Sequence, residues 1–336
     1  TKCKDMKFKE ALGIDISKEK IDVHLHLKNV ENTFTNQPKG FKQMFSWLER
    51  QSSYSIDEVA ICLEHTGLYS SLITKFFYEK GITFFIVPAL EIKRSMGIAR
   101  GKTDQIDAMR IAEYAYLRKE QLNPCPMPSR SIMKLRQLLS LRDRLVKQRS
   151  GFMATLKGNK QAFTKTENPA IFNIPKKMIH YISKQIDDIE KKIKSLIQSD
   201  AELKKLYSLI SSIKGIGFIL TSYILATTNG FQNFENSRKY ACYCGVAPFQ
   251  KQSGKSVKGK TGVSHLANKK MKSLFNIAAC SAIQTDNELK QYFQRRTLMG
   301  KSKMSTLNIV RNKLIHRVFA VVKRGTPFVT LHKYAA

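Results

Sequence analysis

The order of apolar patterns near the start of the chain constrains the fold more than any other feature. Residues 11–15 (ALGID) form an apolar run, and residues 21–27 (IDVHLHL) alternate between apolar and polar side chains. The polar stretch SKEK separates the two runs, which is the pattern of a β-hairpin. Residues 32–36 are the candidate for a third strand. We therefore expect the chain to begin with antiparallel strands.

Helix and strand patterns alternate in the residues that follow. Pro38 opens a helical spacing of apolar residues over 39–51, and residues 59–63 have the composition of a buried strand. A second helix over residues 68–80 leads to a further strand over residues 82–87. With one more helix, the order β-β-β-α-β-α-β-α predicts a mixed sheet flanked by helices, which is the ribonuclease-H-like pattern.

Four carboxylates stand where this pattern places strand ends and a helix start. Asp15 closes the first strand, Glu64 closes the fourth, and Asp104 with Asp107 opens the helix after the fifth. Strand ends in an α/β sheet meet at one edge, where ligands usually bind. Converging carboxylates need cations, and two Mg²⁺ ions are the usual solution in phosphoryl transfer. Read singly, these acids would only begin a turn, form an exposed ion pair or favour a helix start.

A large excess of positive charge extends over most of the chain. The 58 Lys and Arg residues outnumber 26 Asp and Glu residues and give a formal net charge of +32. Such a charge favours a polyanionic partner, for which nucleic acid fits best. The sequence contains no apolar run of about 18 residues and no signal-peptide pattern. We therefore expect a cytoplasmic protein without a membrane partner.

Three prolines in residues 123–128 (NPCPMP) indicate a domain boundary. We expect an α/β domain over residues 1–125, followed by all-α structure. A basic helical coiled-coil region over residues 126–206 would link it to a mainly helical C-terminal domain over residues 207–336.

The expected coiled-coil region contains two helical patterns. Apolar residues repeat at helical spacing over 132–145 and at near-heptad spacing over 182–196. Interruptions at Pro169 and Pro175 predict an antiparallel return. Such a hairpin either only spaces the domains or dimerises with a basic face on nucleic acid, and we favour dimerisation. The expected phosphate contacts of the first helix are Arg136, Arg142, Arg144 and Lys147.

The C-terminal domain begins with two apolar segments around a Gly215-x-Gly217 turn, over residues 209–226. This pattern matches a helix-hairpin-helix, whose backbone N–H groups bind phosphate, and Lys214 beside the turn favours that function. A packed corner between two helices is the alternative. Further helical patterns over residues 266–279, 281–295 and 305–323 complete the domain.

The stretch from Phe249 to Gln284 contains no acidic residue. Its small residues, lysines and glycines predict a flexible loop that approaches a phosphodiester closely. Ser253, before Gly254, is a candidate exposed nucleophile, although a serine beside a glycine is more often an ordinary loop residue. The expected nucleic-acid contacts are Lys251, Lys255, Lys258, Lys260, Lys269 and Lys270.

Several motifs resemble those of a known family. GIDISK from residue 13, EHTG from residue 64 and KTDQIDA from residue 102 are similar to motifs of the DEDD transposases of bacterial insertion sequences. These include recombinases guided by a bridge RNA, and they also resemble Piv-type DNA invertases. GVAP from residue 245, followed by a basic SG loop and a helix, resembles their second domain.

The resemblance implies a RuvC-like domain whose metal-binding tetrad is Asp15, Glu64, Asp104 and Asp107, with Mg²⁺ as the cofactor. It further implies donor and target DNA as substrates, a structured guide RNA that pairs with both, and a dimer or tetramer with a composite site. Lys102 in the third motif is a candidate contact to nucleic acid. The protein would work at the bacterial nucleoid.

The resemblance also implies that Ser253 is the covalent nucleophile, which would attack the scissile phosphate and form a phosphoserine link. Gln252 stands where many relatives have a second serine, so the alignment depends on Ser253 and Gly254. Ser256 and Ser264 are weaker candidates.

A DNA transposase or recombinase is thus the leading hypothesis. The main alternative is a metal-dependent nuclease of the Holliday-junction type, which would use the tetrad without a covalent intermediate. A non-catalytic scaffold that binds nucleic acid is a third class.

Overall fold

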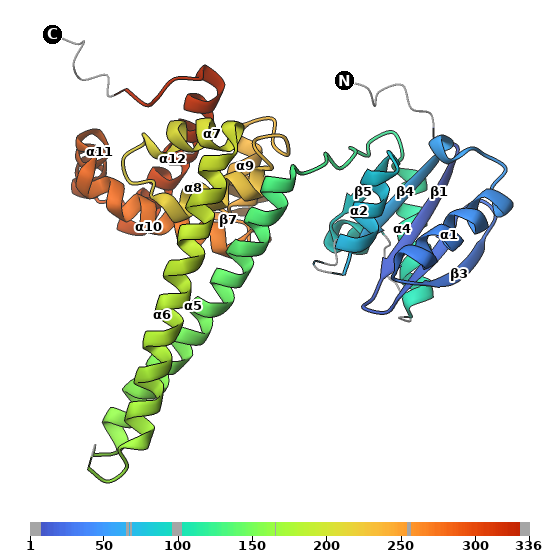
Figure 1. Cartoon of the computed structure of the whole chain (residues 1–336). Coiled ribbons are helices and arrows are strands. Elements are labelled where there is room, and N and C mark those ends of the chain that lie inside the picture. Colours follow the sequence, from blue (N-terminus) through green and yellow to red (C-terminus); the bar gives the residue numbers. More distant parts are fainter. Residues whose placement is uncertain are drawn as a thin grey trace. The chain divides into compact units, whose positions relative to one another are not determined.

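The computed structural model describes residues 8–64, 67, 69–95, 103–164, 166–253 and 257–329, with backbone alone for 251–253, 257, 258, 260 and 261 (Figure 1). The chain divides into two compact units, Thr1–Met127 and Pro128–Ala336. Each unit has a hydrophobic core of its own. Among the described residues, no helix is long and apolar enough to cross a membrane.

The first unit contains a five-stranded mixed sheet in the spatial order β3-β2-β1-β4-β5. The pairs β1–β2 and β2–β3 are antiparallel, whereas β1–β4 and β4–β5 are parallel. This arrangement confirms the expected mixed sheet and is compatible with a RuvC-like domain. The strands are β1 (Glu10–Ile16), β2 (Lys20–Leu25), β3 (Val30–Thr35), β4 (Val59–Glu64) and β5 (Phe84–Val87).

Helices cover both faces of this sheet. Leu12, Ile14 and Ile16 of β1 pack in one core with α1 and α2, while Ala11 packs on the opposite face with α3 and α4. This division follows from the alternation of side chains along a strand. The helical elements are α1 (Pro38–Gln51), the 3₁₀ turn η1 (Ile56–Glu58), α2 (Ser71–Glu79), α3 (Ala89–Ser95) and α4 (Asp104–Leu117).

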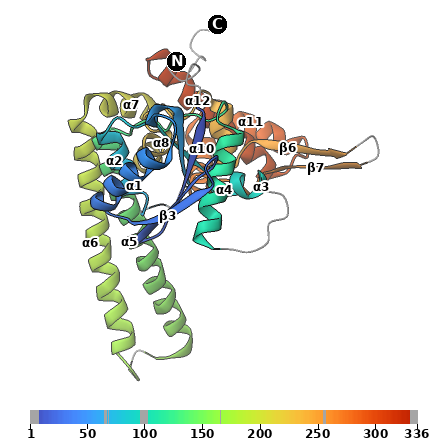
Figure 2. The same cartoon turned by 90° about the vertical axis from the view of Figure 1, so that its right-hand side faces the viewer.

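The second unit is mainly helical, as expected, and begins with a long helical hairpin that both views show side by side (Figures 1 and 2). Contacts from Arg142 to Glu190 and from Arg149 to Ser183 run in opposite order along its two helices, which makes the hairpin antiparallel. The helices are α5 (Arg130–Ala162), α6 (Ala170–Ser199), α7 (Ala201–Ser211), α8 (Phe218–Thr228), α9 (Ser237–Tyr243), α10 (Lys269–Thr285), α11 (Asn287–Leu298) and α12 (Lys303–Arg324).

The expected interruption at Pro175 is wrong, because α6 runs through this residue, and only Pro169 stands at its start. Proline lacks the N–H that would otherwise bond to the carbonyl four residues earlier. Here that carbonyl, Ile171 O, accepts a hydrogen bond of 2.9 Å from Nδ2 of Asn159 on α5. A side chain of the neighbouring helix therefore replaces the missing backbone donor.

The expected flexible loop after Phe249 is also wrong in part. Its described residues form an antiparallel ribbon of β6 (Pro248–Ser253) and β7 (Val257–Val263), which Figure 2 shows projecting from the helices of its unit. Residues 254–256 lie outside the described part.

Two helix boundaries also differ from expectation. The helix expected from residue 266 begins at Lys269, because the side chain of Asn268 caps it and accepts from Met271 N at 3.0 Å. The pattern over 281–295 is not one helix. Asp286 accepts from Leu289 N at 3.0 Å and so starts α11, which separates it from α10. Such side-chain acceptors are typical helix starts.

The hairpin predicts a coupling between two residues. Asn159→Ala should destabilise the protein by about 1 kcal/mol, since it leaves Ile171 O without its donor. In a Pro175→Ala background the restored N–H can bond to that carbonyl, so the cost of Asn159→Ala should fall below about 0.5 kcal/mol. Denaturant unfolding of the four variants measures this. Gln161→Ala, at an exposed position of α5, is the control, and equal costs in both backgrounds would contradict the assignment.

Candidate functional site

The position of α4 over β1 sets the geometry of the candidate site. A Cβ atom at Gly13 would overlap the Ala108 carbonyl oxygen and the Ala112 nitrogen, so only glycine lets the helix approach this closely. Thr103 fixes the start of the helix, because its side chain accepts a hydrogen bond of 3.2 Å from Ile106 N. The first turn of α4 therefore lies above the same face of β1 that carries Asp15, two residues after Gly13.

The strands bring Glu64 to the same face. Ile14 pairs with Leu63 in the parallel register of β1 and β4, so the next residues, Asp15 and Glu64, are neighbours at the carboxyl ends of the two strands. Ala60 and Cys62 belong to the core under α4, and alternation places Glu64 on that face too. The predicted convergence of strand-end acids therefore has a direct geometric cause.

The electrostatics of Asp15 show that the acids are close together. Burial raises the pKa of its carboxyl to about 6, and the negative charges of Asp104, Asp107 and Glu64 add to this increase. A hydrogen bond of 3.0 Å from Ile16 N acts in the opposite direction. The structure thus brings all four predicted acids into mutual electrostatic range, with an excess of negative charge around Asp15.

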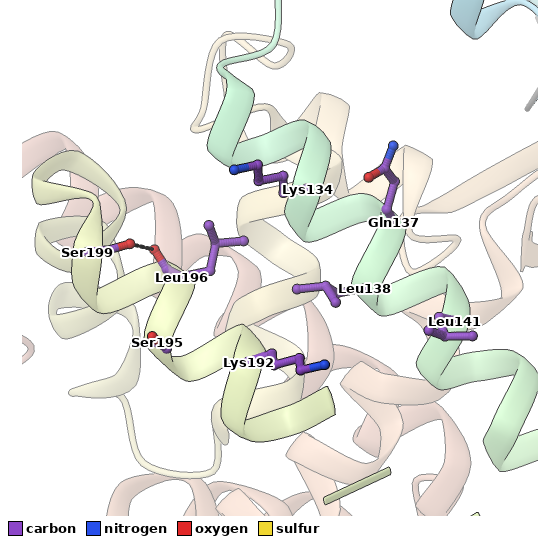
Figure 3. Close-up of a pocket in the computed structure, with 8 residues that line it drawn as sticks. All are labelled: Lys134, Gln137, Leu138, Leu141, Lys192, Ser195, Leu196 and Ser199. Carbon is purple, nitrogen blue, oxygen red and sulfur yellow. Dashed lines mark hydrogen bonds between the residues drawn. The ribbon is translucent and has the colours of Figure 1, made fainter. Parts of the chain in front are cut away.

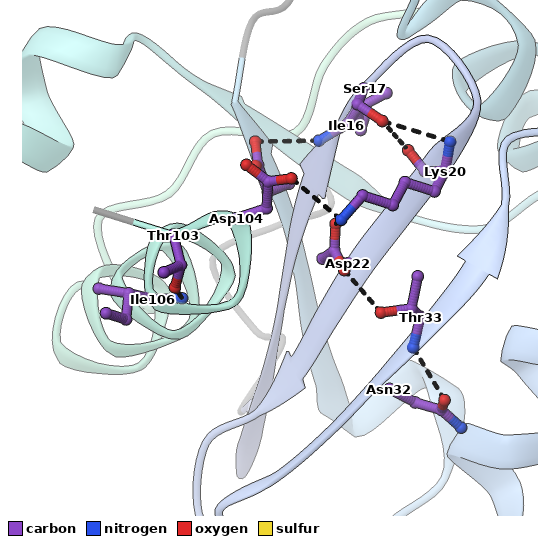
Figure 4. A network of polar contacts seen from close by, with 10 residues as sticks. Ile16, Ser17, Lys20, Asp22, Asn32, Thr33, Thr103, Asp104 and Ile106 are labelled. Carbon is purple, nitrogen blue, oxygen red and sulfur yellow. Dashed lines mark hydrogen bonds and ion pairs between the residues drawn. The ribbon is translucent and has the colours of Figure 1, made fainter. Parts of the chain in front are cut away.

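Two residues that the sequence analysis missed complete this cluster. Lys20 Nζ lies 3.0 Å from Oδ2 of Asp104 and 3.0 Å from Oδ2 of Asp22 (Figure 4). Asp22 is buried, faces Asp15 in the register of β1 and β2, and accepts a hydrogen bond of 2.6 Å from Thr33 Oγ1. The alternation in IDVHLHL could have identified Asp22, since it places this residue on the other face of β2 from Ile21, Val23 and Leu25.

A pocket of about 380 Å³ opens beside these residues, with Lys20, Asp22, Thr33, Thr103, Asp104 and Gln105 in its lining.

The remaining acid of the α4 start, Asp107, pairs with Arg110 at 3.0 Å. Within the described residues, no group of three or more carboxylate, imidazole or thiol side chains is arranged as a ready metal cage. The donors are nevertheless carboxylate oxygens, which suit Mg²⁺, and a divalent cation would relieve the excess charge around Asp15.

The candidate nucleophile lies in the second unit. Ser253 is the last residue of β6 and pairs with Val257. Its side chain lies outside the described part of the structure, as do those of Lys251, Lys258 and Lys260; Lys102, Lys255 and Ser256 lie outside it altogether. Ser264 has a local structural contact, because its Oγ accepts from Leu266 N at 3.1 Å.

Three of the predicted nucleic-acid contacts also bind groups of their own unit. Arg136 Nε donates to Ala226 O at 3.0 Å, Arg142 pairs with Glu190 at 2.8 Å, and Lys270 pairs with Asp143 at 2.5 Å. These contacts give the three side chains structural roles. The predicted contacts with exposed side chains are Arg144, Lys147, Lys214 and Lys269.

The turn between α7 and α8 has one packed and one open glycine. Gly215 has φ +90°, and a Cβ there would lie 2.7 Å from Cβ of Ala282 on α10. At Gly217, which caps α8, a Cβ would meet nothing within 4 Å. The turn is thus a packed corner at Gly215, while the space that a Cβ would occupy at Gly217 is open.

Another pocket, of about 490 Å³, lies between α5 and α6 (Figure 3). Leu138, Leu141 and Leu196 are among its lining residues. Lys134 of α5 and Lys192 of α6 also line it. The residues that line it include no carboxylate, imidazole or thiol, so the pocket lacks the groups for metal or acid-base chemistry.

The charge excess is uneven between the units. Residues Thr1–Met127 contain 16 acidic and 19 basic residues, whereas Pro128–Ala336 contains 10 acidic and 39 basic ones. The expectation of an excess over most of the chain is confirmed, since the second unit contains 209 of the 336 residues. The positive charge belongs almost wholly to the second unit, and the candidate acidic site lies in the nearly neutral first unit.

Comparisons with known proteins give consistent matches in both units. Residues 12–159 match a model of DEDD transposases of the IS110 type, and residues 207–294 match the transposase family IS116/IS110/IS902. The pilin gene-inverting protein of Moraxella bovis is 27% identical over 332 residues, which cover 95% of this chain and 98% of that protein. The pilin gene-inverting protein of Moraxella lacunata has the same identity and coverage. An uncharacterised 43.6 kDa protein of the insertion element IS110 from Streptomyces coelicolor is 25% identical over 134 residues, or 40% of this chain and 33% of that protein.

The raised pKa of Asp15 predicts an unusual dependence of stability on pH. The folded carboxyl titrates near pH 6, above its ordinary value of 3.8, so the folded state holds a proton that the unfolded state releases. Its contribution to stability is therefore present near pH 4 and is lost as the pH rises through 6. Asp15→Asn should accordingly raise the Tm at pH 8 and lose this advantage near pH 4.

Thermal unfolding of both proteins between pH 4 and pH 8, without divalent cations, measures this difference. Asp57→Asn, at an exposed position of η1, is the matched control. A difference in Tm between Asp15→Asn and the wild type that does not change with pH would contradict the prediction.

Proposed function

The chain belongs to the IS116/IS110/IS902 family of transposases, and on this premise we propose how it acts as a DNA recombinase. Asp15, Glu64, Asp104 and Asp107 hold Mg²⁺ at the scissile phosphate, and Ser253 is the nucleophile. The observation that carries the metal assignment is the raised pKa of Asp15 beside three further carboxylates. A cluster of this kind favours divalent cations and is typical of functional sites.

The carboxylates would hold two Mg²⁺ ions, which when bound orient the phosphate and neutralise its developing charge. The contribution of the protein is to position these four carboxylates. The ends of β1 and β4 present Asp15 and Glu64, and the first turn of α4 presents Asp104 and Asp107. Because sheet and helix are joined at Gly13 by close backbone packing, the oxygen donors are held on rigid elements.

The serine step conserves the energy of the DNA backbone. Ser253 Oγ attacks phosphorus, one P–O bond to the deoxyribose breaks, and the leaving sugar oxygen takes up the proton that the serine gives up. A sugar hydroxyl of a second strand then attacks the phosphoserine, reversing the exchange with a new partner. Supporting this role, Ser253 ends a strand of a projecting ribbon that is surrounded in sequence by lysines.

The second unit would bind the nucleic acid. Its excess of 39 basic over 10 acidic residues supplies the attraction to phosphate. The exposed side chains of Arg144, Lys147, Lys214 and Lys269 are the proposed contacts, together with the lysines around Ser253 and with Lys102. The turn before α8 would act as a helix-hairpin-helix, whose backbone N–H groups bind a phosphate, and the open space at Gly217 is compatible with this role.

We include a structured bridge RNA and a dimer or tetramer in this proposal, as the family resemblance implies. The DNA sequence would then be recognised by base pairing with the RNA, and the protein would contact the sugar-phosphate backbones of the nucleic acids. Exposed apolar side chains near the closed end of the hairpin support its role in self-association as a coiled coil: Met153 at 55% exposure, Phe163 at 54%, Ile174 at 60% and Tyr181 at 60%.

A metal-dependent nuclease of the Holliday-junction type is the second candidate. It is favoured by the fact that all four carboxylates belong to the first unit, so that metal-assisted hydrolysis by water would need no residue of the ribbon.

The two candidates differ in the effect of Ser253→Ala. The protein, with the RNA that co-purifies with it, is incubated in Mg²⁺ with DNA that carries the ends of its own element. The wild type should give a covalent protein–DNA species on a denaturing gel. Ser253→Ala should lose this species and about 10³-fold or more of strand exchange, since an alanine side chain has no oxygen to attack the phosphorus.

Ser264→Ala is the matched control and should behave like the wild type, because Ser264 only accepts a local hydrogen bond. Asp15→Asn and Asp104→Asn should abolish cleavage while leaving DNA binding. Cleavage that persists unchanged in Ser253→Ala, without a covalent species, would exclude the serine mechanism and favour the nuclease.

A further inference from the structure

A lysine ammonium links two carboxylates at the candidate site. Lys20 Nζ is 3.0 Å from Oδ2 of Asp22 and 3.0 Å from Oδ2 of Asp104, and so connects β2 with the start of α4 (Figure 4). Its side chain is 45% exposed and borders the pocket beside the acids. The ammonium thus neutralises part of the negative charge that gathers at this edge of the sheet.

The two carboxylates that Lys20 joins differ in solvent exposure and in their other partners. The side chain of Asp22 is 3% exposed and has a further hydrogen bond of 2.6 Å from Thr33 Oγ1. A buried carboxylate needs such partners, so its pairing with Lys20 is hard to give up. The side chain of Asp104 is 53% exposed, and water can replace the ammonium there at little cost.

We propose that Lys20 is a positioning residue of the metal site, which binds Asp104 until a divalent cation takes its place. This inference rests on the proposed function, in which Asp104 is a metal ligand. Without metal, the ammonium keeps the start of α4 close to β2 and so holds Asp104 near Asp15. On metal binding, Lys20 leaves Asp104 and stays on Asp22, so its pairing with Asp104 lowers the affinity of the free protein for the metal.

The experiment measures the affinity for Mn²⁺, as a probe for Mg²⁺, by the EPR signal of the free ion in the absence of DNA. Lys20→Met should bind Mn²⁺ about two- to fivefold more tightly than the wild type, which is the range expected for the loss of one exposed ion pair. Lys20→Arg keeps the pairing and should bind like the wild type. Lys18→Met, at an exposed position two residues away, removes an equal charge without contact to Asp104 and should have a smaller effect than Lys20→Met.

A double variant separates competition from general electrostatics. Lys20→Met with Asp22→Asn removes one positive and one negative charge, so the net charge near the site is unchanged, and the buried position keeps an acceptor for Thr33. It also avoids a buried carboxylate without its partner, which is the main folding hazard of Lys20→Met alone. This variant should still bind Mn²⁺ more tightly than the wild type. In Asp22→Asn alone, Lys20 keeps only Asp104 as a charged partner, so this variant should bind Mn²⁺ more weakly than the wild type.

The failure of this inference is distinct from the failure of the proposed function. If the wild type binds no Mn²⁺, or if Asp104→Asn binds it unchanged, then the metal site itself is wrong and the role of Lys20 falls with it. If Asp104→Asn loses Mn²⁺ but the double variant binds no more tightly than the wild type, only the role of Lys20 is overturned.

Discussion

The backbone contact between α4 and β1 at Gly13 is the constraint on which the candidate site depends. A helix normally stands off a sheet by the length of its side chains, and here the absence of a Cβ at Gly13 removes that distance. As a result, the first turn of α4 comes down onto the strand end that carries Asp15. The acids of the helix and those of the strands belong to separate sequence segments, and this one contact brings them together.

Such a concentration of carboxylates is costly, and the fold offsets the cost with cations of its own. Lys20 and Arg110 pair with Asp104 and Asp107, while the burial of Asp15 and the charges around it raise its pKa to about 6. The cluster is therefore neither a relaxed surface patch nor a finished metal cage. It is an arrangement in which ammonium and guanidinium groups of the chain pair with carboxylates whose oxygens also suit a divalent cation.

Much of the first unit could be predicted because its information is local. Alternation along the strands and apolar spacing in the helices predicted the sheet, and the strand-end positions of Asp15 and Glu64 predicted that these two acids lie side by side. What could not be predicted depends on contacts between distant segments. Pro175 stays inside α6 only because Asn159 of another helix bonds to Ile171. Asp22 lies beside the acids of the candidate site because β2 pairs with β1 and sets Asp22 opposite Asp15. Arg142 could not be distinguished in the sequence from exposed basic residues, because its partner Glu190 lies on the other helix of the hairpin.

The division of charge between the units follows from what each has to do with a polyanion. A site made of carboxylates repels DNA until cations are bound, so it cannot itself supply the affinity for the substrate. That affinity has to come from elsewhere in the chain, and the second unit, with 39 basic against 10 acidic residues, has the charge to provide it. Attraction of this kind to phosphate weakens steeply as the salt concentration rises. Acids that were dispersed in the basic unit would be neutralised by their neighbours. In the nearly neutral first unit, 16 acidic residues face only 19 basic ones, so fewer cations compete for the carboxylates of the proposed metal site.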